Sequence, residues 1–293
     1  MHEMPISENP GGREPPERSG RPMRRLFIPA AAAAGVLFVA SVAGLAFGRS
    51  LFNEPGVREL KSVRDELGAE RLLFVFAHPD DEITANALIA RAKKEGLAVY
   101  TLTATRGEAG AQYPPVVDQP HLGVVREGEL RKHLFALGVD RATILDLGDG
   151  KLESRDFETL VGLVAAEIAD TRADAVITFH PESGVSDHRD HKRIGAATRE
   201  AAGRSEAAPT LYYVLGPRPA LNRFGGETGA KVAAHQPPPA FAVKAPARDK
   251  KRAWRIHQSQ SEFLQAAWGL SPTVLYLLWT EEYYARADET GAP

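Results

Sequence analysis

The 293-residue sequence contains no cysteine, which excludes disulfides, thiol catalysis and cysteine-ligated zinc. It also lacks a charge excess, because 36 Lys and Arg stand against 38 Asp and Glu, for a net charge of −2. A dedicated nucleic-acid binder usually carries a basic excess, so we expect no nucleic-acid partner. No glycine-rich G-x-G-x-x-G turn follows the first apolar run, which argues against a dinucleotide cofactor. Any metal site must therefore use His, Asp and Glu.

The N-terminal region differs in composition from the rest of the chain. Residues 1–25 are rich in proline, glycine and charge, and we expect them to form a disordered basic tail. Residues 26–48 carry no charge, and a helix of that length would cross about 30 Å of hydrocarbon. Five arginines precede this segment, which predicts a cytoplasmic N-terminal end and an extracytoplasmic folded part.

Two fates are compatible with this transmembrane or signal segment. It can remain as a membrane anchor, or it can be cleaved near the small residues 41–43 (SVA) after export. Residues 24–28 (RRLFI) resemble a twin-arginine export signal. We therefore expect a membrane-anchored extracytoplasmic domain or an exported one; the sequence does not identify any protein partner.

The remainder of the chain alternates apolar runs with amphipathic segments. Residues 49–70 read as a juxtamembrane linker with a short helix, and residues 71–288 as the folded domain. The expected strands are 72–77, 99–104, 142–147, 175–179 and 211–215, and the expected helices are 81–94, 124–137, 157–169, 189–202 and 249–267. This alternation predicts an α/β fold, a single Rossmann-like domain with a mostly parallel sheet. We expect a surface loop over 217–239 and a last buried element over 273–279.

Two polar clusters follow expected strands. Residues 77–82 (AHPDDE) end the first strand, and residues 187–191 (DHRDH) lie beyond the fourth. Because ligands of an open parallel sheet bind at the carboxyl ends of its strands, we expect both clusters at one edge. His78 and Asp81 are three residues apart and can face one metal.

The residue types in these clusters favour a catalytic metal. Two histidines and one aspartate leave an open position on zinc, and a neighbouring carboxylate can act as a base. His188 and His191 also lie three apart, so spacing leaves open which of the two is the ligand. The alternatives are that Asp80 only caps a helix and that His188 is a surface residue.

These motifs resemble those of the PIG-L (LmbE-like) family of zinc-dependent N-acetylglucosaminyl deacetylases. The resemblance is carried by residues 77–82 (AHPDDE), 105–108 (TRGE) and 188–191 (HRDH), and by Lys251, Ala253, His257, Ser259 and Gln260. It implies a Zn²⁺ ion bound by His78, Asp81 and His191. It implies that Asp80 is the general base, that His188 stabilises the oxyanion or protonates the leaving amine, and that Asp190 orients His188.

The resemblance also implies substrate contacts, with some departures. Arg106 and Glu108 would contact the substrate, although they could equally form a structural ion pair. Ser186 and Asp187 stand where some family members have an aromatic residue and a glycine, and we expect Asp187 to raise the pKa of His188.

Other histidines have weaker patterns. His180 and Glu182 lie near the expected site and could serve a turn or the substrate. We expect His121, His133 and His235 to be surface or packing residues.

The resemblance implies removal of the N-acetyl group from an N-acetylglucosamine-containing glycan, glycolipid or glycoside. The partners would be this N-acetylated amino sugar and, through the N-terminal helix, a membrane. The alternatives are a metal-dependent phosphoester hydrolase, which would want two metals, and a non-catalytic sugar-binding domain.

Overall fold

A computed structural model describes residues 24–289, with side chains from residue 32 onward. The chain divides into two compact units, residues 1–44 and 45–293. The expected tail lies almost entirely outside the described residues. Helix α1 (Arg24–Phe52) contains the charge-free segment, and its part from Ala32 to Phe52 is apolar and long enough to cross a membrane.

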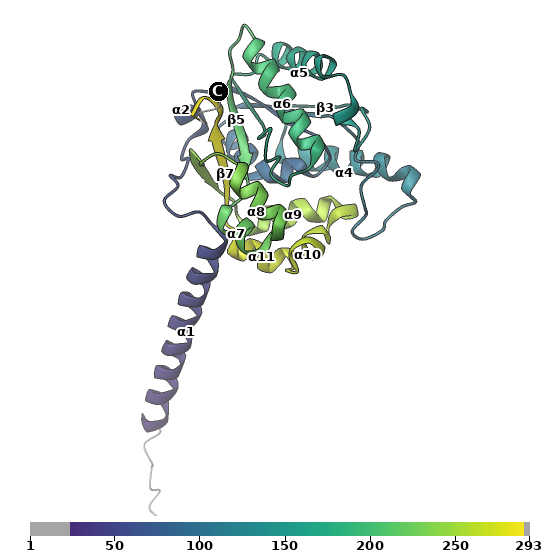
Figure 1. Ribbon diagram of the computed structural model, residues 1–293. Helices are drawn as coiled ribbons and strands as arrows, with labels where there is room; N and C mark the ends of the chain where they lie inside the picture. The colour runs from purple at the N-terminus through teal and green to yellow at the C-terminus, as the bar shows by residue number, and fades with distance from the viewer. Residues whose placement is uncertain (1–23, 290–293) are drawn as a thin grey trace, which may run out of the picture. The chain divides into compact units, whose positions relative to one another are not determined.

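The second unit is built around a seven-stranded sheet (Figure 1). Its strands are β1 (Arg71–Phe76), β2 (Ala98–Thr103), β3 (Arg141–Ile144), β4 (Ala175–Phe179), β5 (Thr210–Leu215), β6 (Phe241–Lys244) and β7 (Glu281–Arg286). The order is β3-β2-β1-β4-β5-β7-β6, with the first five strands parallel and β6 and β7 antiparallel. The mostly parallel Rossmann-like sheet is therefore confirmed.

Helices cover both faces of the sheet. They are α2 (Val63–Leu67), α3 (Asn86–Lys94), α4 (Leu122–Leu137), α5 (Phe157–Thr171), α6 (Arg189–Arg204), α7 (Arg218–Phe224), α8 (Gly226–His235), α9 (Ala247–Ile256), α10 (Phe263–Trp268) and α11 (Pro272–Leu278). Helices α5 and α6 lie side by side (Figure 1). Right-handed crossovers put α3 and α4 on the opposite face from α5 and α6. Buried on both faces, β1 is apolar throughout after Arg71.

Four predictions about elements were wrong or incomplete. The helix expected over 249–267 is divided into α9 and α10 by a 3₁₀ turn, Gln258–Gln260. Residues 217–239 are not a loop, because α7 and α8 form there; Pro219 stands in the first turn of α7, where a missing N–H costs nothing. The helix expected over 81–94 starts as a 3₁₀ turn, Asp81–Ala85, before α3. The antiparallel strands β6 and β7 were not predicted, since β6 is short and β7 begins with two glutamates.

Candidate metal and catalytic site

The two polar clusters meet at the carboxyl-terminal edge of the sheet, as the strand order requires. His78 and Asp81 follow β1, whereas His191 lies in the first turn of α6, after β4. His78 Nδ1 lies 3.2 Å from His191 Nε2, which lies 3.2 Å from Asp81 Oδ1; His78 Nδ1 lies 3.7 Å from Asp81 Oδ2. All three side chains are buried. Two histidines and one carboxylate thus form a compact triangle.

The opposite ring nitrogens fix the orientation of both histidines. His78 Nε2 lies 3.0 Å from Asp149 Oδ1 and 3.3 Å from Asp190 Oδ2, so it must donate its proton to these carboxylates. His191 Nδ1 donates to the Gly184 carbonyl at 2.9 Å. In the neutral rings, His78 Nδ1 and His191 Nε2 therefore direct lone pairs at each other. Two facing lone pairs repel each other, so a cation must lie between them.

The electrostatics of the triangle favour positive charge. Burial lowers the pKa of His78, but hydrogen bonds to Asp149 and Asp190 outweigh it and raise this pKa to about 10. Burial raises the pKa of Asp81, yet the rings of His191 and His78 hold it below its usual range. The carboxylates thus attract a cation to this point, and either a proton or a metal ion can supply it.

The donor set fits zinc in both chemistry and spacing. Ligand atoms about 2.0–2.1 Å from a tetrahedral ion lie about 3.3–3.4 Å apart, close to the distances of the triangle. The second nitrogens of His78 and His191 are bound to carboxylates and a carbonyl, as is usual for metal-ligating histidines. Asp81 Oδ2 accepts backbone N–H groups of Ala77 and His78, which leaves Oδ1 for the ion.

Asp80 is held beside the triangle in an unusual backbone conformation. Its φ of +92° is a left-handed value that a residue with a Cβ rarely adopts. The Asp80 N–H donates to Glu82 at 2.9 Å, and Arg126 Nη2 donates to Asp80 Oδ2 at 2.9 Å and to the Pro79 carbonyl at 2.6 Å. Burial raises the pKa of Asp80 to about 6, against the opposing charge of Arg126. The carboxylate is thus fixed in place with a pKa near neutrality.

A buried network that the sequence did not predict supports this loop. Glu82 Oε1 lies 2.6 Å from His133 Nδ1 and 2.6 Å from His257 Nε2. His133 is therefore an internal partner of Glu82, where we had expected surface or packing. The signal was present in α4, because Arg126, Glu129 and His133 follow helical spacing and form a buried polar stripe.

His188 lies at the mouth of the triangle. It is exposed, and its ring centroid lies 4.8 Å from that of His78. As the N-cap of α6, its Nδ1 accepts the Asp190 N–H at 3.2 Å, so in the neutral ring Nε2 carries the proton. His188 can therefore donate a hydrogen bond into the site.

Two expectations about the neighbours of His188 need correction. Asp187 does not raise the pKa of His188: its carboxylate binds Lys192 and Lys231, and burial, with the nearby rings of His191 and His78, lowers this pKa. The Asp190 carboxylate bonds to His78 and to the N–H groups of Gly150 and Leu152, and only its backbone contacts His188.

Arg106 and Glu108 do not pair with each other. Arg106 forms an ion pair with Glu127 at 2.8 Å, and Glu108 accepts the Asp149 N–H at 2.8 Å. Glu108 thereby positions Asp149, which in turn holds His78.

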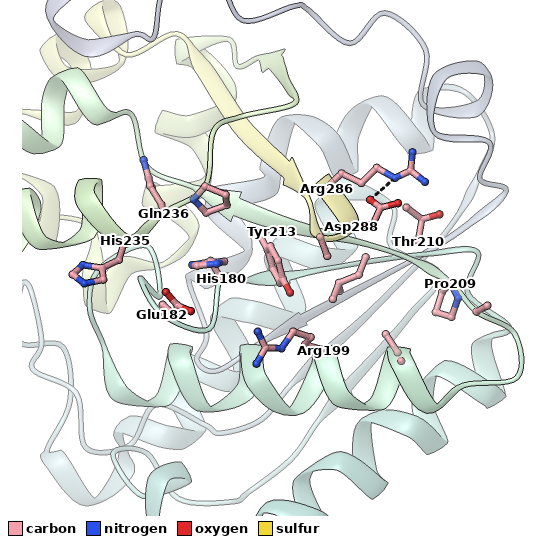
Figure 2. A pocket seen from close by; sticks show the side chains of 16 residues that line it. His180, Glu182, Arg199, Pro209, Thr210, Tyr213, His235, Gln236, Arg286 and Asp288 are labelled. Carbon is pink, nitrogen blue, oxygen red and sulfur yellow. Dashed lines mark ion pairs between the residues drawn. The ribbon is translucent and has the colours of Figure 1, made fainter. Parts of the chain in front are cut away.

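A groove of about 750 Å³ is lined in part by His180 and Glu182, in the loop after β4 (Figure 2). His180 and Glu182 line one end of it, near His235, and the Arg286–Asp288 ion pair lines the other. Tyr213, from β5, forms part of its floor. The loop after β4 thus contributes both to this groove and, through Gly184, to the support of His191.

Part of the chain is similar in sequence to known deacetylases. Residues 73–202 match the sequence profile of PIG-L, described as GlcNAc-PI de-N-acetylase. A 1D-myo-inositol 2-acetamido-2-deoxy-alpha-D-glucopyranoside deacetylase of Kineococcus radiotolerans is 32% identical over 234 residues, covering 64% of each chain. The Streptomyces avermitilis deacetylase of the same name is 28% identical over 281 residues, covering 78% of this chain and 96% of its own. The chain thus spans slightly under two thirds of the first relative.

Solved structures share the fold. An N,N'-diacetylchitobiose deacetylase from Pyrococcus horikoshii has a TM-score of 0.57 and 18% identity, covering 76% of this chain and 89% of its own. A 4-carboxy-2-hydroxymuconate hydratase from Pseudomonas putida has a TM-score of 0.54 and 16% identity, covering 74% and 96%. Because a hydratase shares the fold with a deacetylase, the fold alone does not decide the reaction.

Proposed function

We propose that this chain is a zinc-dependent deacetylase acting on an N-acetylglucosamine-containing compound, because residues 73–202 match the PIG-L family model. The observation that carries the proposal is the buried triangle of His78, Asp81 and His191, in which two ring nitrogens face each other at 3.2 Å beside Asp80. A site with a cation-binding triangle and an adjacent carboxylate base suits hydrolysis of an amide.

His78, Asp81 and His191 would hold the ion through Nδ1, a carboxylate oxygen and Nε2. Zinc in this position supplies Lewis acidity, which polarises an acyl carbonyl and lowers the pKa of a nearby water. The buried carboxylates of Asp149 and Asp190 keep the His78 ring in the orientation that binding requires.

Asp80 would accept the proton of the attacking water. Arg126 occupies Oδ2, which leaves Oδ1 as the acceptor. A base with a pKa near 6 is mostly deprotonated at neutral pH and still binds a proton in the transition state. The left-handed backbone at Asp80 costs on the order of 1–3 kcal/mol, which the contacts of Glu82 and Arg126 offset.

His188 would act on the opposite side of the reacting carbonyl. Its Nε2–H donates a hydrogen bond to the oxygen that becomes negative in the tetrahedral intermediate. The water oxygen bonds to the acyl carbon and the C–N bond breaks. The proton that Asp80 accepted from the water passes to the amine nitrogen. Acetate and a free amine are the products.

The relatives suggest the class of substrate. Two are named for an N-acetylglucosamine unit linked to myo-inositol, and such a glycoside is the first compound we would test. A hydroxyl-rich carrier also suits the mixed polar lining of the groove, where Tyr213 and His180 offer ring surfaces.

The two alternatives have less support. A two-metal phosphoesterase needs free carboxylates beside the triangle, but oxygens of Asp149 and Asp190 accept backbone N–H groups and brace His78. Sugar binding alone does not require a carboxylate on a strained backbone beside a metal site.

We also propose that α1 anchors the chain in a membrane with the domain outside the cytoplasm. The apolar stretch Ala32–Phe52, preceded by arginines, supports an anchor, although a signal segment would have the same composition.

The decisive experiment is an acetate-release assay on the full-length protein. We expect higher kcat/KM for the N-acetylglucosaminyl inositol glycoside than for N-acetyl amino acids, because the site is surrounded by polar groups that pair with hydroxyls. Faster turnover of N-acetyl amino acids or peptides on the same preparation would contradict the proposal.

A further inference from the structure

Helices at one end of the second unit carry large exposed apolar side chains. They are Phe224 on α7, Phe263 on α10, and Val274 and Leu277 on α11, each 40–48% exposed. Val274 and Leu277 are three residues apart and share a helix face. Helices α7, α10 and α11 lie together at this end (Figure 1). We call these four residues the apolar face.

This end of the unit also receives the last turns of α1. Arg49 Nε donates to the Leu277 carbonyl at 3.1 Å, and Asn53 Nδ2 donates to the Leu278 carbonyl at 2.7 Å. Phe52 stacks on Phe224 with ring centroids 5.0 Å apart. The apolar face is therefore continuous with the point where the charge-free stretch of α1 ends.

The approach of α11 to α1 is as close as the side chains permit. A Cβ on Gly48 would lie 2.8 Å from Leu278 Cδ2, so only glycine leaves room there without a shift. Contacts on Arg49, Phe52 and Asn53 make this junction part of the folded unit. If α1 crosses a membrane, its last turn at residues 49–53, which contacts α7 and α11, is the part of the second unit that meets the lipid–water interface.

We propose that the apolar face inserts into the interfacial region of the membrane that α1 spans. The inference rests on the proposed anchor. An anchored domain meets the bilayer at a high effective concentration, so even a small apolar area suffices for docking. Trp268 and Trp279 are half-buried against the apolar cluster that contains Phe52 and Leu275, with ring centroids 6.0 Å apart, and tryptophan is typical of the membrane interface.

The absence of cysteine makes a direct test possible. Single Leu277→Cys, Val39→Cys and Phe135→Cys variants of the full chain would be labelled with an environment-sensitive fluorophore. They would be reconstituted in phosphatidylcholine–phosphatidylglycerol vesicles, with or without spin-labelled lipid. Val39, in α1, reports the anchor. Phe135, on α4 and 86% exposed, is the matched apolar control away from this end.

We expect a blue shift and lipid quenching at residues 277 and 39, with shallow quenching at 277 and deep quenching at 39. The label at residue 135 should show neither. Val274→Cys provides a second position if Leu277→Cys does not fold.

The other outcomes separate the two proposals. Quenching at 39 but not at 277 or 274 leaves the anchor intact and overturns docking. No quenching at 39 overturns both, because no bilayer then lies beside the face. A blue shift at 277 without quenching by lipid means that protein, such as a second copy, covers the face, and this also overturns lipid docking.

Discussion

Each side chain of the proposed zinc site uses one atom toward the site and another toward the surrounding protein. His78 is held by Asp149 and Asp190, and His191 by the Gly184 carbonyl. At the scale of residues, function therefore depends on pairs, in which the second member sets the tautomer or the rotamer of the first.

Loss of any ligand should lower zinc binding. We expect about one zinc per chain in the wild type, and a clear fall in His78→Ala, Asp81→Ala and His191→Ala, because three ligands leave little redundancy. Metal analysis of the purified proteins measures this. His180→Ala is the matched control, since His180 is as buried as His191 but lines the groove. His188→Ala should also retain zinc; if it loses the metal instead, His188 and His191 must exchange roles.

Asp80→Asn should separate binding from catalysis. The amide has the shape of the carboxylate but cannot accept the proton, so turnover should fall roughly 10²–10⁴-fold while zinc content is unchanged. Asp187→Asn is the control, because Asp187 also has a positive φ, of +61°, yet its carboxylate faces two lysines. An Asp80→Asn enzyme with wild-type kcat would remove Asp80 from the mechanism.

At the scale of elements, the approach of α6 to β4 positions the second half of the site. The ring of Phe179, at the end of β4, stacks on His191 with centroids 4.2 Å apart. One turn along α6, a Cβ on Gly195 would lie 2.2 Å from the Phe179 carbonyl oxygen. Glycine at this position lets the helix touch the strand.

Gly195→Ala should therefore weaken both the fold and the metal site. We expect a loss of about 1–3 kcal/mol in the free energy of unfolding, from the forced separation of α6 and β4, together with weaker zinc binding. Denaturant titration and metal analysis test these effects. Gly162→Ala, at an exposed α5 position with no atom near the added Cβ, should stabilise by about 0.5–1 kcal/mol. Equal effects of the two substitutions would refute the close-packing argument.

At the scale of the whole molecule, the proposed anchor α1 would decide on which side of the membrane the proposed reaction takes place. We expect the full-length protein to remain with membranes after an alkaline wash, and its domain to be accessible to protease from outside the cytoplasm. Protection on the cytoplasmic side would reverse the topology. If the double variant Arg24→Lys, Arg25→Lys is exported as well as the wild type, the twin-arginine route is excluded.

Much of this molecule was predictable from local pattern. Strands β1 and β4 are apolar runs because both faces of the sheet are covered there, so they could be recognised by composition alone. The meeting of residues 77–82 with residues 187–191 followed from the rule that parallel strands gather their carboxyl ends at one edge. The antiparallel strands were not predicted, because β7 is stabilised by pairing with β5 and β6, which no local pattern encodes.

The sequence by itself determined which residue types reach the site, whereas the tertiary structure decided what each of them contacts. Asp190 was expected to orient His188, but its carboxylate faces His78, because the turn of α6 directs it toward the loop at Gly150. The sequence shows no partner for His133, because Glu82 is distant in sequence and comes close only through the packing of α4 beside the loop that carries it. A hydrogen bond is sensitive to shifts of a few tenths of an ångström. For residues far apart in sequence, only the packing of helices on the sheet fixes their distance this closely.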